Sequence, residues 1–343
     1  MRFEMRLAKA LILAGALVVA SCEDPSQGTG IITGPVNPTP EPPSEEVRIP
    51  DYEDDYSAIA GWNNHSKWNL ANVHDPSIAY YDGYYYMYCT DASYGNEHLK
   101  ATKGKHFPGK RSKDLVNWEY VPGPMNEAPA WVADSLNSIR KRMGVPAIEK
   151  NKISYGYWAP VIREVDGKLR MYYCIVIDNS IKTGGVGFDG SWTERAFIGM
   201  CESTDPAGGV WEDKGFIVCS SSDKGANGWK RPNENNWEGY FYYNAIDPTY
   251  LVDDPSGKHY LIYGSWHTGI AAIEIDPETG KLKEHPGNPW KIGSTGAGAT
   301  TRYGKRIYTR KAGDRWQASE GPEVIYNPET RYYYMFLAYD ELS

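Results

Sequence analysis

A motif that occurs four times constrains the fold of this chain more than any other feature. Each copy reads as a proline, a short apolar strand, a polar turn and an aromatic strand. The copies are NVHDPSIAYYDGYYYMYCT from Asn72, YWAPVIREVDGKLRMYYCIVID from Tyr157, AIDPTYLVDDPSGKHYLIYGSW from Ala245 and SEGPEVIYNPETRYYYMFLAYD from Ser319. The turn of the first copy, Asp82-Gly83, favours a tight hairpin. The sequence therefore predicts one antiparallel unit repeated around an axis.

The spacing of the copies indicates which kind of repeat this is. Pro76, Pro160, Pro248 and Pro322 lie about 75 to 90 residues apart, which suits a four-stranded propeller blade with large loops. We therefore predict an all-β fold on a β-propeller plan. The aromatic share of 13%, with 27 Tyr and 12 Trp, fits strand and core positions and leaves rings on which sugars could stack.

Charge and motif content disfavour several other classes. Lys and Arg (36) are fewer than Asp and Glu (44), so the basic surface of a nucleic-acid-binding protein is not expected. The Gly-rich stretch Gly293 to Thr301 lacks the lysine of a phosphate loop. No G-x-S-x-G motif of a serine hydrolase occurs. A metal centre built on His74, Asp75 and His267 is disfavoured because no helix-spaced histidine pair is present.

Residues 1–22 form a predicted export signal. A basic start precedes an apolar run from Leu11 to Ala20, which is too short to span a membrane. Val19-Ala20-Ser21-Cys22 resembles a bacterial lipobox, which predicts that a lipidated Cys22 anchors the protein to the outer membrane, at the cell surface. An ordinary signal peptide with an incidental cysteine is the alternative.

A linker and one domain are predicted after the signal. Residues 23–50 are rich in Gly, Pro, Ser, Thr and Glu, a composition that cannot offset the entropy of folding and predicts a semi-extended linker. Residues 51–343 are predicted to form one domain. Within it, Ala133 to Ile148 has apolar residues at helical spacing and predicts an inserted helix on the side of the propeller. Arg111 to Tyr120 predicts an edge strand and a turn.

The cysteines of the domain carry no metal-binding spacing. We predict that they are buried thiols, with disulfides as the alternative in an exported protein. They are Cys89, Cys174, Cys201 and Cys219.

Three carboxylates stand at the starts of repeats. Asp75 and Asp247 directly precede the motif proline, and Glu320 stands at the start of the fourth copy. The first residues of innermost propeller strands point into the axial cavity, so these carboxylates are expected to converge and to raise at least one pKa. A carboxylic acid with a raised pKa and an ionised carboxylate are the two groups that glycoside hydrolysis needs. The alternative is that Asp-Pro and Gly-Pro only mark strand starts.

The elements HDPSI, YWAP, NAIDP and SEGP, in this order before paired aromatic strands, resemble glycoside hydrolase family 43. Within that family the resemblance is closest to bacterial endo-α-1,5-L-arabinanases, and it extends from about Asn72 to the C-terminus. It implies a five-bladed β-propeller that hydrolyses glycosides with inversion. In this chain the fourth blade would be incomplete and the fifth absent.

The resemblance also implies a role for each carboxylate. Asp75 matches the general base that activates water, Glu320 the general acid that protonates the leaving oxygen, and Asp247 the carboxylate that orients the acid and raises its pKa. Inversion requires Asp75 and Glu320 to lie roughly 6.5 to 9.5 Å apart, which leaves room for the water. Glu323 is the rival acid, disfavoured because it falls within the strand.

Further residues are predicted to surround these carboxylates. Trp158 is expected to stack on a sugar ring, with core packing as the alternative. Asn244, Trp266 and His267 are expected to bind substrate, with a structural role for His267 as the alternative. No cofactor is required for the chemistry and no metal ligand is predicted. A structural calcium ion in the central channel, which the resemblance implies, stays in doubt.

The sequence thus predicts an exported monomer that cuts within α-1,5-L-arabinan during plant polysaccharide degradation. An exo-acting α-L-arabinofuranosidase or β-xylosidase would use the same three carboxylates. A non-catalytic surface glycan-binding lipoprotein is the alternative from another class. Loops such as Thr90 to Phe107 and Gly225 to Gly239 decide between endo and exo action.

The fourth repeat ends at Ser343, directly after its second strand. A propeller closes by pairing its last blade with its first, and an open propeller exposes sheet edges. We therefore expect a longer chain, in which roughly 100 further residues or more supply the fifth blade, and we expect these 343 residues alone to aggregate. A four-bladed propeller closed by a strand near Trp62 to Leu70 is the alternative.

Overall fold

The computed structural model describes residues 73–91, 105–142, 146–177, 195–220, 243–265, 269–284, 303–309 and 319–339. The chain divides into two compact units, Met1–Asp51 and Tyr52–Ser343, and every described residue lies in the second. The predicted signal, linker and lipidated Cys22 therefore lie outside the described residues, as do Trp266 and His267.

The described part is built almost entirely of β-strands. The strands are β1 (Ser77–Tyr81), β2 (Tyr84–Tyr88), β3 (Gly109–Ser112), β4 (Glu119–Val121), β5 (Tyr155–Val165), β6 (Lys168–Ile177), β7 (Arg195–Asp205), β8 (Val210–Cys219), β9 (Thr249–Asp253), β10 (Lys258–Tyr263), β11 (Ile270–Ile275), β12 (Lys305–Tyr308), β13 (Ser319–Asn327) and β14 (Tyr332–Tyr339). The helices are α2 (Ala130–Arg142) and the short 3-10 helix η3 (Lys150–Lys152).

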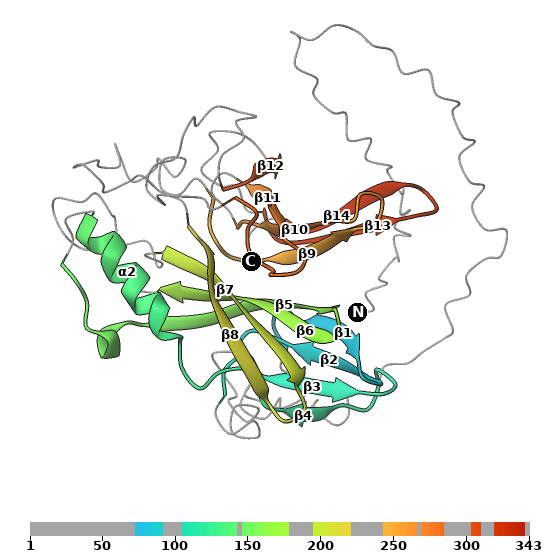
Figure 1. The fold of residues 1–343 in the computed structure, drawn as a ribbon, viewed down its shortest axis with the longest axis horizontal. Helices are drawn as coiled ribbons and strands as arrows, with labels where there is room; N and C mark the ends of the chain where they lie inside the picture. The colour runs from blue at the N-terminus through green and yellow to red at the C-terminus, as the bar shows by residue number, and fades with distance from the viewer. Residues whose placement is uncertain are drawn as a thin grey trace, which may run out of the picture. The chain divides into compact units, whose positions relative to one another are not determined.

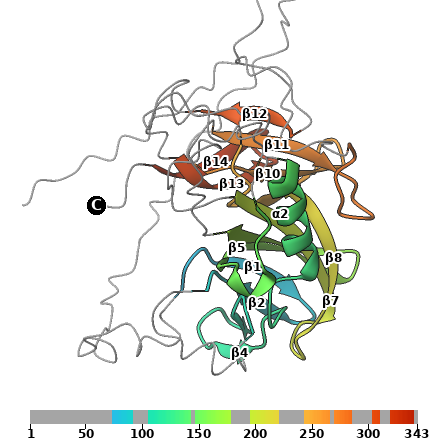
Figure 2. The ribbon, with the colours of Figure 1, turned by 90° about the vertical axis from the view of Figure 1, so that its left-hand side faces the viewer.

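The strands form four antiparallel sheets, in each of which neighbours in the chain pair with one another (Figure 1). Sheet 1 contains β1 to β4, sheet 2 contains β5 to β8, sheet 3 contains β9 to β12, and sheet 4 contains β13 and β14. Figures 1 and 2 both show sheet 2 between sheets 1 and 3. The predicted all-β propeller plan is confirmed, with one sheet for each repeat and, in the described part, one α-helix.

The first strands of the four sheets lie against one another in chain order. β1 contacts β5, β5 contacts β9, and β9 contacts β13. Each of these strands starts at or near the motif proline of its repeat, so the proline motifs gather in the middle of the domain. This arrangement is the one that brings residues from different repeats to a common site.

The residue before each motif proline has a left-handed backbone conformation. Its φ angle is 46° at Asp75, 41° at Ala159, 55° at Asp247 and 59° at Gly321. A residue before proline normally adopts an extended conformation, and the left-handed region costs an L-residue free energy. The same unusual backbone in all four sheets shows that the repeats share one detailed geometry.

The core consists of clusters between neighbouring sheets. In β6, Tyr173 and Ile175 pack in the cluster that sheet 1 shares with sheet 2, whereas Tyr172 and Cys174 pack in the cluster shared by sheets 2 and 3. A third cluster, around Val324, joins sheets 3 and 4. Alternating residues of a strand point to opposite faces, so β6 is apolar almost throughout because both faces of sheet 2 are covered.

Helix α2 packs on the outer strands of sheet 2 (Figure 2). Trp131 makes edge-to-face contacts with Phe197 and Phe216 in β7 and β8. The predicted helix is therefore confirmed, but its predicted bounds are wrong. It begins at Ala130 and ends at Arg142, because Pro146 cannot continue a helix.

The edge strand and the turn predicted for Arg111 to Tyr120 are present, since β4 lies at the edge of sheet 1 and a turn precedes it, but the stretch also includes the end of β3. β3 ends at Ser112, and β4 begins at Glu119. Between them the Asp114 carboxylate accepts the backbone N–H groups of Val116 and Asn117, at 2.9 and 2.7 Å. These bonds close a turn, so the stretch belongs to two strands of one sheet.

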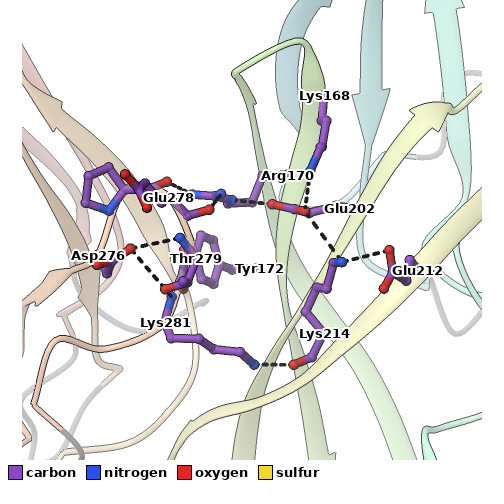
Figure 3. A network of polar contacts seen from close by, with 12 residues as sticks. Lys168, Arg170, Tyr172, Glu202, Glu212, Lys214, Asp276, Glu278, Thr279 and Lys281 are labelled. Carbon is purple, nitrogen blue, oxygen red and sulfur yellow. Dashed lines mark hydrogen bonds and ion pairs between the residues drawn. The ribbon is translucent and has the colours of Figure 1, made fainter.

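Arg170 forms a buried ion pair within sheet 2 and also connects this sheet to sheet 3 (Figure 3). Arg170 of β6 donates to Glu202 of β7 at 2.8 Å, and both side chains are at least 92% buried. Its other nitrogens donate to Tyr250 in β9 and to the carbonyls of Pro277 and Glu278 after β11. Burial alone would raise the pKa of Glu202, but the hydrogen bond and charge of Arg170 outweigh it and hold that pKa below its usual value.

The four cysteines of the domain are free, buried thiols, as predicted. Burial raises the pKa of Cys89 and of Cys219 to about 11. Such thiols behave as small apolar side chains. Among the residues that the structure describes, no helix is long and apolar enough to cross a membrane.

Candidate active site

The three predicted carboxylates lie at the starts of three neighbouring first strands. Asp75 precedes β1, Asp247 precedes β9, and Glu320 is the second residue of β13. The charges of Asp75 and Glu320 both act on Asp247 and raise its pKa. The structure thus places Asp75 and Glu320, which are far apart in the sequence, within electrostatic reach of Asp247.

Asp247 has the most perturbed carboxyl group of the three. Burial is the largest cause, and together with the two neighbouring charges it raises the pKa of Asp247 from 3.8 to about 7. The backbone N–H of Gly321 donates to Asp247 Oδ2 at 3.0 Å, and a hydrogen bond with Ser265 acts in the same direction, so both oppose the rise. The expected raised pKa is therefore present, and it falls on Asp247.

Ser265 connects Asp247 to Glu320. Its hydroxyl, which follows β10, donates to Glu320 Oε2 at 3.2 Å and is also hydrogen-bonded to Asp247. Gly321, whose N–H binds Asp247, directly follows Glu320 in β13. Asp247 is therefore linked to Glu320 in two ways, through a hydroxyl group and through the neighbouring backbone.

The Asp75 side chain is hydrogen-bonded by a residue that follows β2 of sheet 1. The Thr90 hydroxyl donates to Asp75 Oδ2 at 2.6 Å, and His74 Nδ1 lies 3.9 Å from the same oxygen. The Asp75 side chain is 49% exposed, so it is open to water. An accessible carboxylate with a fixed orientation can accept a proton from a water molecule.

Glu323, the rival acid, is engaged elsewhere. Arg163 of β5 donates to Glu323 Oε1 at 2.6 Å, and the Thr249 hydroxyl of β9 donates to Glu323 Oε2 at 2.7 Å. Both carboxylate oxygens therefore bind fixed donors from sheets 2 and 3. A register shift in β13 separates Glu320 from Glu323, so the two side chains have different neighbours.

Two further predicted residues can be placed. Trp158 in β5 is half-buried and packs on the cluster between sheets 2 and 3. Its indole lies over Gly156, where a Cβ would come within 2.8 Å of Trp158 Nε1. Asn244 is 3% exposed, and its Oδ1 accepts a hydrogen bond from Ser220 at 2.7 Å. Substrate binding by either residue stays a prediction.

The described segments contain no group of three or more His, Cys, Asp and Glu side chains that could hold a metal ion. The structural calcium ion that the resemblance implies stays a prediction, and no step of the chemistry is derived through a metal.

Thr90, Ser265 and Arg163 were not identified from the sequence. Thr90 and Ser265 each lie two residues after the second strand of a repeat, as the last residues of YYYMYCT and HYLIYGS. A hydroxyl at this place in two of four repeats is the signal that could have identified them. Arg163 gives no such signal, because its partner in β13 lies 160 residues away.

A propeller whose first strands bring three carboxylates together has the architecture and the reactive groups of a glycosidase. The chain belongs to the glycosyl hydrolases family 43, whose family model matches residues 70–343.

Two curated relatives are similar over most of the chain. An extracellular endo-α-(1→5)-L-arabinanase of Thermotoga petrophila is 30% identical over 276 residues, which are 80% of this chain and 46% of that protein. Extracellular endo-α-(1→5)-L-arabinanase 2 of Bacillus subtilis is 26% identical over 272 residues, 79% of this chain and 45% of that protein. The chain thus spans about half the length of the curated relatives that it matches.

Solved structures with a similar chain path include the endo-1,5-α-L-arabinanase of Thermotoga petrophila RKU-1. It is 26% identical, with a TM-score of 0.47, over 79% of this chain and 48% of that one. The endo-arabinanase of Bacillus licheniformis is 21% identical, also with a TM-score of 0.47, over 79% of this chain and 66% of that one.

Proposed function

We propose that this protein is an exported glycoside hydrolase that cuts within α-1,5-L-arabinan with inversion of configuration. The observation that carries the proposal is the meeting of three carboxylates from three repeats, one of them with a pKa raised to about 7. The names of the curated relatives, extracellular endo-α-(1→5)-L-arabinanases, support both the substrate and export.

In the proposed reaction, Asp75 acts as the general base. Its carboxylate takes a proton from a water molecule while the water oxygen attacks the anomeric carbon. Glu320 acts as the general acid and gives its proton to the glycosidic oxygen as the bond to the anomeric carbon breaks. Asp75 ends protonated and Glu320 ionised, and exchange with solvent restores both.

Asp247 is proposed to orient the acid and to keep it protonated. Its links to Glu320, through Ser265 and through the N–H of Gly321, support the orienting role. Because the pKa of Asp247 itself is raised to about 7, its charge can disfavour the ionised form of Glu320 only near or above that pH. The bonds of Glu323 to Arg163 and Thr249 support Glu320 as the acid, because they occupy both oxygens of Glu323.

Matched variants test these roles on linear arabinan and on an aryl arabinofuranoside with a good leaving group. Asp75→Asn should lower kcat on both substrates by roughly 10²- to 10⁴-fold, since both need the base. Glu320→Gln should lose activity on arabinan but keep most of it on the aryl substrate, whose leaving group needs no proton. Glu323→Gln is the control and should retain activity on both. If Glu323→Gln loses activity on arabinan alone while Glu320→Gln stays active on both substrates, Glu323 is the general acid and Glu320 is not.

The size of the products separates the candidate functions. Endo action releases a series of oligosaccharides from linear arabinan, whereas the exo-acting arabinofuranosidase or β-xylosidase alternatives release single sugars. Binding of arabinan without any product would favour the non-catalytic glycan-binding protein.

The lipid anchor stays part of the proposal on the lipobox-like sequence before Cys22. Membrane fractionation of Cys22→Ala tests it, because the variant should leave the membrane fraction. Membrane association that survives this substitution would contradict the anchor.

A further inference from the structure

The hydroxyl of Thr90 bridges two repeats at the base site. Thr90 lies two residues after β2, and 7% of its surface is exposed. Its Oγ1 lies 2.6 Å from Asp75 Oδ2, in the same sheet, and accepts the backbone N–H of Ala159 in sheet 2 at 2.7 Å. One hydroxyl group therefore connects the aspartate of the first repeat to the backbone of the second.

These two contacts fix the direction of the hydroxyl proton. An N–H group can only donate, so the bond from Ala159 uses a lone pair of Thr90 Oγ1. The hydroxyl then has one proton to give, and Asp75 Oδ2 is the acceptor in line with it. The arrangement therefore fixes the orientation of the Asp75 carboxylate relative to the backbone of the second repeat.

The backbone around Thr90 is held on both sides. Its own N–H donates to the carbonyl of His74 at 2.9 Å, and the N–H of Asp91 donates to the carbonyl of Tyr157 at 3.0 Å. The Asp91 carboxylate in turn accepts the N–H of Phe107 at 2.8 Å. Thr90 is thus attached to the starts of the first and the second repeat, so its hydroxyl has little freedom to move away from Asp75.

A related contact without a hydroxyl occurs between sheets 3 and 4. There the N–H of Gly321 donates directly to Asp247 Oδ2 at 3.0 Å. Gly321 and Ala159 are equivalent left-handed residues before a motif proline. In both places an N–H from the next repeat supports the preceding aspartate, but at Asp75 the support passes through Thr90.

We propose that Thr90 is a positioning residue, whose hydroxyl holds the Asp75 carboxylate in the orientation that a general base requires. This inference rests on the proposed function, because it gives Asp75 the role of base. Thr90 acts through Asp75 and touches neither water nor sugar in the proposed reaction.

The test compares Thr90→Val, which keeps the shape but removes the hydroxyl, with Thr90→Ser, which keeps the hydroxyl. In Thr90→Val, kcat on linear arabinan should fall roughly ten- to hundredfold with little change in KM, the loss expected for one hydrogen bond to a charged group. Thr90→Ser should stay within a few-fold of the unchanged protein, because it keeps the hydroxyl that orients Asp75.

Thr249→Val is the matched control. It also removes a buried hydroxyl that donates to a carboxylate, that of Glu323, so it carries a similar loss of packing and hydrogen bonding. Its kcat on linear arabinan should stay within a few-fold of that of the unchanged protein. Thermal melts of all variants show whether each remains folded.

Two results would overturn the inference: a Thr90→Val kcat that stays within a few-fold of the unchanged protein, or a Thr90→Ser loss as large as that of Thr90→Val. If the unchanged protein does not cleave arabinan, the proposed function fails and the positioning claim is decided by the ¹³C chemical shift of the Asp75 carboxyl, assigned by the loss of its signal in Asp75→Asn. That chemical shift should change in Thr90→Val and be restored in Thr90→Ser. Equal chemical shifts in the unchanged protein and both variants would reject the role of Thr90.

Discussion

At the scale of single residues, the carboxyl of Asp247 links function to stability. Burial and the charges of Asp75 and Glu320 raise its pKa from 3.8 to about 7. The folded protein therefore binds a proton at Asp247 more tightly than the unfolded chain does. The contribution of Asp247 to stability is then fully present below about pH 4 and is lost as the pH rises toward 7.

Asp247→Asn should remove this dependence, because an amide cannot ionise but can still accept the N–H of Gly321. The variant should gain about 3 kcal/mol of stability relative to the unchanged protein as the pH rises from 5 to 8, because part of the effect of a shift from 3.8 to about 7 already falls below pH 5. Denaturant unfolding at both pH values measures it. A stability difference that is the same at pH 5 and pH 8 would show that Asp247 titrates normally in the fold.

The carboxylates could be predicted from the sequence because a repeated motif marks them. Asp75 and Asp247 precede the motif proline of their repeats, and the repeat geometry brings them together. Thr90 and Ser265 could not be predicted, since a hydroxyl residue after a strand is common and its partner depends on the exact register. The preference for Glu320 over Glu323 followed from position alone, and the structure adds the physical reason, which is the engagement of Glu323 by two fixed donors.

At the scale of strands and sheets, Arg170 pairs with Glu202 within sheet 2 and also donates to carbonyl groups after β11 of sheet 3 (Figure 3). Arg170→Met should cost about 3 to 5 kcal/mol in unfolding free energy, because it leaves the buried Glu202 carboxylate without its partner. Lys168→Met is the control. Lys168 contacts the same carboxylate at 3.3 Å, but its side chain is 46% exposed, so its loss should cost less than about 1 kcal/mol.

Denaturant unfolding of both variants makes this comparison. Equal, small losses would mean that Glu202 is satisfied without Arg170 and that the contact between the sheets depends on apolar packing alone.

The hairpins could be predicted at this scale, while the element boundaries could not. Asp82 and Gly83 both have positive φ angles, 45° and 79°, which is the conformation that the Asp-Gly turn predicts. The ends of α2 and the split of Arg111 to Tyr120 into two strands depend on local hydrogen bonds, such as those of Asp114. The Arg170–Glu202 pair joins residues of adjacent strands that periodicity alone does not distinguish from exposed charges.

At the scale of the whole molecule, the four-fold motif was sufficient to predict one sheet for each repeat. Apolar clusters between successive sheets then follow, because each sheet has two faces to cover. The choice between endo and exo action could not be predicted, since it depends on loops and not on the repeated strands. Trp266, His267 and the loops considered for this choice lie wholly or largely outside the described residues.

The central claim is that carboxylates from separate repeats hydrolyse α-1,5-L-arabinan by direct attack of water. Proton NMR of a fresh digest of linear arabinan tests it most directly, because the configuration of the first-formed reducing end records how the water attacked. The account predicts that the β-anomer appears first and that the α-anomer grows in later by mutarotation. An α-anomer formed first would mean retention of configuration, and would contradict the roles of Asp75 as base and Glu320 as acid.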